Sequence, residues 1–118
     1  MAKHNETGEK GESLAAKMLQ EKGYAILHRN WRCGHKEVDI IASCGDLALF
    51  VEVKTRSSTR MGFPEEAISP RKMRLLQEAA QAFMEEHQEF QRMQFDVVTF
   101  LIRGNVVTEV QHLEDILF

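Results

Sequence analysis

The segment from Leu47 to Lys54, which reads LALFVEVK, constrains the fold more than any other part of the sequence. An almost unbroken apolar run of this length is typical of a strand buried on both faces in the middle of a sheet. A segment with helical spacing (residues 70–90) separates it from the next apolar, β-rich segment (residues 95–102). A helix between two strands permits a parallel crossover connection. We therefore predict a mixed β-sheet flanked by helices.

Turn signals and periodicity predict both helices. Residues 6–22 carry apolar side chains at helical spacing and are followed by Gly23, a stop signal. Ser69 and Pro70 are typical of the N-cap and first position of a helix. The Ser-, Thr-, Arg- and Gly-rich residues 55–69 before this second helix are expected to form a loop.

Three further strands are expected in addition to the central strand and residues 95–102. The Gly-Asp pair at residues 45–46 is a candidate two-residue turn, which would join a strand at 37–43 to the central strand as a hairpin. The other strands are expected at residues 24–28 and 106–110. The predicted order is α-β-β-β-α-β-β, an α/β fold in a single domain spanning residues 1–118.

Composition excludes several classes of protein. Apolar residues make up 43% of the 118, with only 7 Gly and 2 Pro, which excludes a disordered or collagen-like chain. No apolar run is long enough to span a bilayer, and the opening residues, MAKHNE, lack the apolar stretch of a secretory signal. Cys33 and Cys44 form no CxxC pair, which favours free thiols in a reducing compartment. We therefore expect a cytoplasmic protein with no membrane partner.

The charge distribution is uneven. The net charge of −3 alone gives no reason to expect nucleic acid, but residues 54–74 carry six basic and two acidic side chains. Such a segment can bind an anion locally. The alternative is an ordinary solvated loop and helix start. The candidate phosphate-binding residues are Arg56, Arg60, Arg71, Lys72 and Arg74.

Two charged residues interrupt the central strand. Glu52 and Lys54 are two residues apart and therefore point to the same face. Buried charges destabilise a fold unless they are paired or bind a metal. The alternative is that the end of the strand lies in solvent and carries an ordinary ion pair.

The predicted turn at residues 45–46 also sets the register of the hairpin. It puts Asp39 opposite Glu52 and Glu37 opposite Lys54, and opposed residues share a face. Two facing carboxylates repel each other, and a divalent cation between them removes the repulsion. Carboxylates without nearby His or Cys ligands favour Mg²⁺ or Mn²⁺. A slip of one residue would put the two acids on different faces.

Glu12 and Lys54 are the remaining candidates for this site. Glu12 lies on the shoulder of the apolar face of the first helix, where it is either a third acid of the site or a capping residue. Lys54 could orient a water nucleophile or stabilise charge on a phosphate. Its alternative role is to neutralise Glu37.

Asp39 followed by Glu52-Val53-Lys54 resembles the D…(D/E)xK core of the PD-(D/E)XK nuclease superfamily. Nearly the whole chain resembles one branch of it, the small bacterial YraN-like proteins, which are similar in fold to archaeal Holliday junction resolvases. Six segments in order carry the match: residues 11–15 (GESLA), 23–27 (GYAIL), 37–41 (EVDII), 50–56 (FVEVKTR), 62–67 (GFPEEA) and 95–98 (FDVV).

The resemblance implies a restriction-endonuclease-like core and a set of site residues. Glu12, Asp39 and Glu52 are implied as metal-site acids, and Lys54 as the catalytic lysine. Val38 stands where the superfamily motif has Pro, and Lys36 where the branch has Gly. Neither difference removes a ligand. Asp96 also matches the branch, and both a functional and a structural role stay open for it.

Two functions follow from these observations. The first is a Mg²⁺- or Mn²⁺-dependent endonuclease acting on DNA, in particular on branched or otherwise structured DNA. The second is a non-catalytic module that keeps the nuclease fold and binds nucleic acid or protein. Intact Asp39, Glu52 and Lys54 favour the enzyme, whereas the net negative charge favours the module or a partner that recruits DNA. A second copy of the chain is also open as a partner.

Overall fold

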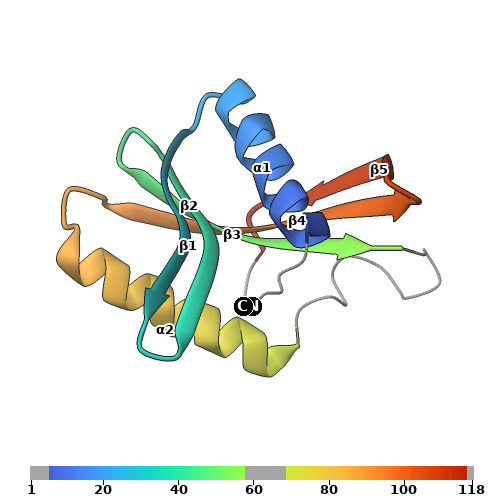
Figure 1. The fold of residues 1–118 in the computed structure, drawn as a ribbon. Coiled ribbons are helices and arrows are strands. Elements are labelled where there is room, and N and C mark those ends of the chain that lie inside the picture. Colours follow the sequence, from blue (N-terminus) through green and yellow to red (C-terminus); the bar gives the residue numbers. More distant parts are fainter. Residues whose placement is uncertain (1–5, 58–68, 117–118) are drawn as a thin grey trace.

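A five-stranded mixed sheet with one helix on each face forms the fold (Figure 1). The computed structural model describes residues 6–57 and 69–116. The elements follow the predicted order: α1 (Glu6–Glu21), β1 (Ala25–Cys33), β2 (Lys36–Cys44), β3 (Leu47–Arg56), α2 (Pro70–Glu86), β4 (Arg92–Arg103) and β5 (Val106–Leu113).

The strands lie side by side in chain order, β1-β2-β3-β4-β5. The β3–β4 pair is parallel and the other pairs are antiparallel, which confirms the predicted crossover through α2. No helix within the described residues is long and apolar enough to cross a lipid bilayer.

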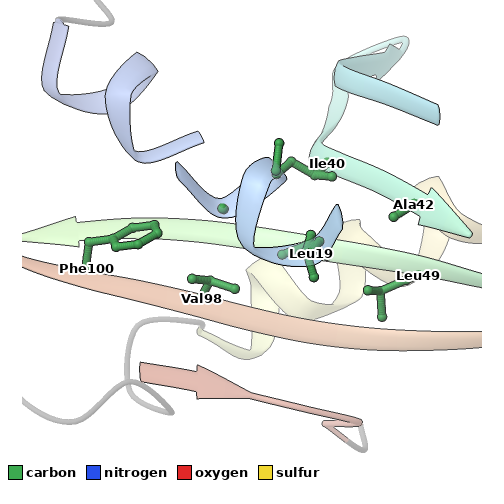
Figure 2. Packing of buried hydrophobic residues seen from close by; sticks show 9 residues of the cluster. Leu19, Ile40, Ala42, Leu49, Val98 and Phe100 are labelled. Atoms are coloured by element: carbon green, nitrogen blue, oxygen red, sulfur yellow. The ribbon is translucent and has the colours of Figure 1, made fainter. Parts of the chain in front are cut away.

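The central strand β3 is buried from both sides, as its apolar run predicts. Leu49 packs beneath α1 with Leu19 and other residues of one core (Figure 2). Val51 belongs to the same core. On the other face, Phe50 packs with Phe83 of α2 in a second core. Strand alternation therefore divides one apolar segment between two cores. The residues of β3 after Val51 continue to alternate between the face covered by α1 and the face covered by α2.

The register of the β2–β3 hairpin is the predicted one. Gly45 adopts a left-handed conformation (φ +60°), which its missing side chain permits at the turn. Cys44 pairs with Leu47, and the ladder continues outward to the pair Ile40 and Val51. Glu52 and Lys54 consequently point to the face that Phe50 shares, which is the face covered by α2.

The structure corrects several predicted boundaries. β1 continues past residue 28 to Cys33, and Trp31 in this extension packs edge-on against Phe83 with ring centroids 5.5 Å apart. The extension reads RNWRC and is mostly exposed, so it lacks the apolar signal of a strand. β3 continues into the expected loop as far as Arg56. Residues 58–68, the greater part of that loop, lie outside the described residues.

The start of α2 is as predicted, but its end is not. Ser69 is the N-cap, because its Oγ accepts a hydrogen bond from the Lys72 backbone N–H at 3.1 Å. α2 ends at Glu86 rather than near residue 90. His87 follows it, stacks on Phe83 and donates its backbone N–H to the Met84 carbonyl oxygen. The ring of His87 thus covers the end of this core.

Candidate metal centre

Asp39 lies where the β2–β3 ladder stops. The last ladder pair is Ile40 and Val51, so Asp39 and Glu52 follow the predicted register but do not form a regular pair. Instead, Asp39 Oδ2 accepts a hydrogen bond from the Val53 backbone N–H at 2.8 Å. The side chain of Asp39 thus satisfies a donor of β3 that regular pairing would have satisfied with a backbone carbonyl. Its carboxylate is held between the two strands.

The backbone of β1 and β2 is irregular at the point where the β2–β3 ladder stops. Val38 packs in the core beneath α2, whereas Ile40 packs in the core beneath α1. Residues two apart in a regular strand share a face, so β2 departs from regular pleating at Asp39. In β1, Asn30 has a positive φ of 55° at the facing position. Asp39 lies between Val38 and Ile40, and its carboxylate reaches the Val53 backbone N–H of β3.

Glu52 is the most unusual side chain of the site. It is only 3% exposed although it carries a carboxylate. Its Oε2 lies 3.3 Å from Lys54 Nζ and 3.6 Å from Lys72 Nζ. Its Oε1 has no hydrogen-bond partner and is one of two such buried side-chain atoms in the described part of the chain. A buried acceptor without a partner is destabilising, so Oε1 is suited to bind a ligand.

Asp39 and Glu52 interact strongly. Burial raises the pKa of Asp39 from 3.8 to about 7, and the negative charges of Glu52 and then Glu12 add to this. The Val53 hydrogen bond and the positive charge of Lys72 act in the opposite direction. A cation between the two carboxylates would relieve the same repulsion. Asp39 can therefore hold either a proton or a metal ion close to neutral pH.

Glu12 approaches the site from α1 but is engaged elsewhere. A Cβ atom at Gly11 would lie 2.7 Å from Thr55 Cγ2, so only glycine lets α1 rest this closely on β3. Glu12 follows in the chain, with its side chain 13% exposed and Oε1 3.9 Å from an Arg29 nitrogen. Glu12, Asp39 and Glu52 are not among the groups whose ligand atoms all lie within 4.8 Å of one another. The structure thus places two of the predicted acids together and the third nearby.

Another group does meet that distance, and the sequence did not indicate it. It comprises Asp96, His112 and Glu114 in β4, β5 and the segment after β5. Asp96 Oδ2 lies 2.7 Å from His112 Nε2, and Asp96 Oδ1 accepts the backbone N–H of Asp115 at 2.9 Å. The predicted last strand ended at Val110, so His112 was outside it.

The side chains of Asp96 and His112 in this second group already have hydrogen-bond partners. Lys22 Nζ lies 2.8 Å from His112 Nδ1, and since an ammonium only donates, Nδ1 accepts and Nε2–H donates to Asp96. Asp96 also accepts from the Gln94 side-chain amide at 3.1 Å. The group therefore ties the segment after β5 to β4 and to Lys22, the residue that follows α1. These contacts give Asp96 a structural role.

The cationic residues separate into different positions. Arg71 and Arg74 are exposed on the first turns of α2, and Arg56 is half-buried with its guanidinium on the Thr55 carbonyl oxygen. Lys72 instead points its amine at Glu52. Arg60 lies outside the described residues.

The expected pairing of Glu37 with Lys54 is wrong. The carboxylate of Glu37 lies 3.7 Å from an Arg32 nitrogen within the β1–β2 hairpin. Lys54 contacts Glu52 on its own strand. The β2–β3 ladder ends before it reaches residues 37 and 54, so the register does not extend to them.

Comparison with known proteins adds a family. A protein-family model described as "Uncharacterised protein family UPF0102" matches residues 11–100. The chain belongs to the UPF0102 family. The match runs from α1 to β4 and includes Glu12, Asp39, Glu52, Lys54 and Lys72.

Relatives in the UPF0102 family are similar over nearly their whole length. The UPF0102 protein of Phocaeicola vulgatus is 40% identical over 115 residues, which cover 98% of this chain and 94% of the relative. That of Bacteroides thetaiotaomicron is 43% identical with the same coverage. That of Syntrophomonas wolfei is 45% identical over 111 residues, 93% of this chain and 96% of the relative.

Proposed function

We propose that this UPF0102 protein is a Mg²⁺- or Mn²⁺-dependent endonuclease that hydrolyses phosphodiester bonds of DNA, in particular branched or otherwise structured DNA. The observation that carries the proposal is the buried carboxylate of Glu52, which has one oxygen without a partner next to Asp39 and Lys54. The resemblance to PD-(D/E)XK nucleases supports the same assignment. The free thiols of Cys33 and Cys44 suit the cytoplasm as its compartment.

The donor set fits a hard divalent cation. Asp39 and Glu52 offer carboxylate oxygens only, which Mg²⁺ and Mn²⁺ prefer over nitrogen or sulfur. Mg²⁺ is commonly held by one or two carboxylates, with water and substrate phosphate completing its shell. Two acids therefore suffice, and Glu12 is not required as a direct ligand. A bound cation would polarise the phosphate and lower the pKa of a water molecule.

The residues of the chain have distinct tasks in this proposal. Glu52 and Asp39 would hold the cation where the β2–β3 ladder stops. Lys54, fixed on β3 beside Glu52, directs its amine at the non-bridging oxygens of the phosphate, where negative charge grows in the transition state. Arg71 and Arg74 on α2 hold flanking phosphates, which fixes the position of the DNA without reading its sequence.

We expect Mn²⁺ to bind weakly to the protein alone, and a double variant, Asp39→Asn with Glu52→Gln, to bind it at least about tenfold more weakly. Both changes keep the shape and remove the charge. Calorimetric titration with Mn²⁺ measures the affinity. Glu37→Gln is the matched control, since Glu37 lies on the same hairpin but pairs with Arg32. Equal Mn²⁺ affinity in wild type and double variant would disprove the metal site.

We expect the double variant Arg71→Glu with Arg74→Glu to bind DNA more weakly and with a smaller salt dependence. Two lost phosphate contacts reduce the slope of log affinity against log salt by roughly 2. Both residues are exposed, so folding should be unaffected. The control is Lys17→Glu with Arg103→Glu, which makes the same change in net charge at exposed positions on α1 and β4. If both double variants weaken binding equally, general repulsion is sufficient and the α2 contacts are not specific.

The net charge of −3 favours a second candidate, a binding module that keeps the fold without catalysis. Linear, nicked and four-way DNA, each incubated with Mg²⁺ or Mn²⁺, separate the two functions. Cleavage supports the enzyme. Binding without cleavage of any form by either metal supports the module.

A further inference from the structure

Lys72 is the second cation at the buried carboxylates, and it comes from a different element than Lys54. Its Nζ lies 3.6 Å from Glu52 Oε2. Its charge also lowers the pKa of Asp39, so it acts on both carboxylates of the site. An ammonium at this place does electrostatically what a metal ion would do there.

The two lysines differ in how firmly they are held. Lys54 belongs to β3, and its side chain is 24% exposed. Lys72 is in the first turn of α2, where its backbone N–H donates to the cap residue Ser69. Its backbone is therefore fixed, but its side chain is 40% exposed and reaches from the solvent side onto Glu52, whose side chain is only 4% exposed. The amine of Lys72 can move outward without any change in the backbone.

The surroundings of Lys72 determine where its amine would go. Arg71 and Arg74 are exposed on the same first turns of α2. The side chain of Lys72 is 40% exposed on the same turns, so its amine can reach a phosphate held there once it leaves Glu52. An ammonium and a divalent cation repel each other strongly at a few ångströms, so both cannot sit between Asp39 and Glu52.

We propose that Lys72 is an internal place-holder for the metal: its ammonium contacts Glu52 and offsets part of the negative charge of the Asp39–Glu52 pair in the metal-free protein, and it moves to a phosphate of the DNA when a divalent cation binds. The inference rests on the proposed function and adds a means of regulation to it. Because the DNA phosphate and the cation both favour the displaced position of Lys72, each tightens the binding of the other. The metal-free protein keeps a formed site that the cation enters readily only together with DNA.

The test compares Lys72→Gln with Arg71→Gln, which removes the same charge one residue earlier from an exposed position. Without DNA, we expect Lys72→Gln to bind Mn²⁺ about tenfold more tightly than wild type, because the competing cation is gone. Arg71→Gln should change the affinity by less than about twofold, and Lys72→Arg, which keeps the charge, should stay close to wild type. Calorimetry measures all three.

Thermal melts give a second readout that does not depend on activity. Metal-free Lys72→Gln should melt at a lower temperature than wild type, since Glu52 loses one of its two cations. At Mn²⁺ concentrations well above both dissociation constants, Mn²⁺ should raise the melting temperature of Lys72→Gln by more than it raises that of wild type, in line with the tighter binding. If Lys72→Gln does not fold without metal, Lys72→Met serves instead, because its apolar chain preserves the packing of the lysine stem.

The outcomes distinguish this inference from the proposed function. Equal or weaker Mn²⁺ binding by Lys72→Gln, with wild-type binding that depends on Asp39 and Glu52, overturns the place-holder role and leaves the metal site intact. If wild type and Lys72→Gln show no Mn²⁺ binding that the Asp39→Asn, Glu52→Gln variant abolishes, the metal site itself is absent and both proposals fail. A similar gain in Arg71→Gln would reduce the effect to general charge and also overturn the role of Lys72.

Discussion

Replacement of Lys54 by alanine should lower the rate of DNA cleavage by about 10²–10³-fold while DNA binding changes little. The reason is a division of tasks: phosphate contacts on α2 set affinity, whereas one amine fixed beside Glu52 acts mainly on the charge that develops in the transition state. Single-turnover cleavage at saturating DNA and Mg²⁺ measures the rate. A filter-binding or fluorescence titration measures the affinity separately.

The control for this experiment is Lys36→Ala, which removes a lysine that pairs with Glu78 of α2 and not with Glu52. It should cleave at the wild-type rate. Lys54→Ala also leaves Glu52 with Lys72 as its remaining cation, so thermal melts must show that the variant is folded. If folded Lys54→Ala cleaves as fast as wild type, the activity belongs to a contaminant or to another site.

The substitution Asp39→Asn should make the metal-free protein more stable at pH 8 and leave its stability almost unchanged below pH 4. In the folded protein the pKa of Asp39 is raised to about 7 from 3.8, chiefly by burial. The folded state therefore retains a proton that the unfolded state releases, and stability falls as pH rises from about 4 to about 7. The loss is at most about 1.4 kcal/mol per pH unit, or a few kcal/mol in total. Asparagine can still accept the Val53 hydrogen bond but has no charge to bury.

Urea unfolding in EDTA at several pH values between 4 and 8 measures this difference. Asp46→Asn is the control, because Asp46 is exposed and its ion pair with Arg92 lies at the hairpin turn. If the free energies of unfolding of wild type and Asp39→Asn differ by the same amount at every pH in this range, the pKa of Asp39 is not raised in the folded protein. Saturating Mn²⁺ should remove the advantage of Asp39→Asn, because the cation stabilises the charged carboxylate of the wild type.

The parts of the fold that the sequence predicts depend on local signals. The left-handed turn at Gly45 fixes the hairpin register, and the apolar run of β3 requires cover on both faces. Together they bring Asp39 close to Glu52. The helix between β3 and β4 then makes their parallel pairing the expected one.

The features that the sequence missed depend on contacts between distant elements or on unusual backbone. The side chain of Asp39 reaches the backbone of β3, and the facing residue of β1, Asn30, has a positive φ. The reach of Lys72 onto Glu52 depends on how α2 docks on the sheet, which no local pattern encodes. His112 was missed because the end of β5 is polar and half-exposed, and its role becomes visible only through Asp96 and Lys22.

The connection between β3 and β4 also bears on how the chain folds. Asp39, Glu52 and Lys54 lie on one hairpin closed by a two-residue turn, whereas Lys72 arrives only when α2 docks within a parallel crossover. Hairpins form within microseconds, while parallel pairing must first close a much longer loop. The two carboxylates should therefore meet while Lys54 is the only lysine beside them. Their repulsion then opposes the transition state for folding, so the part of the pH dependence that comes from this repulsion should appear in the refolding rate, whereas the larger part that comes from burial arises only as the cores close.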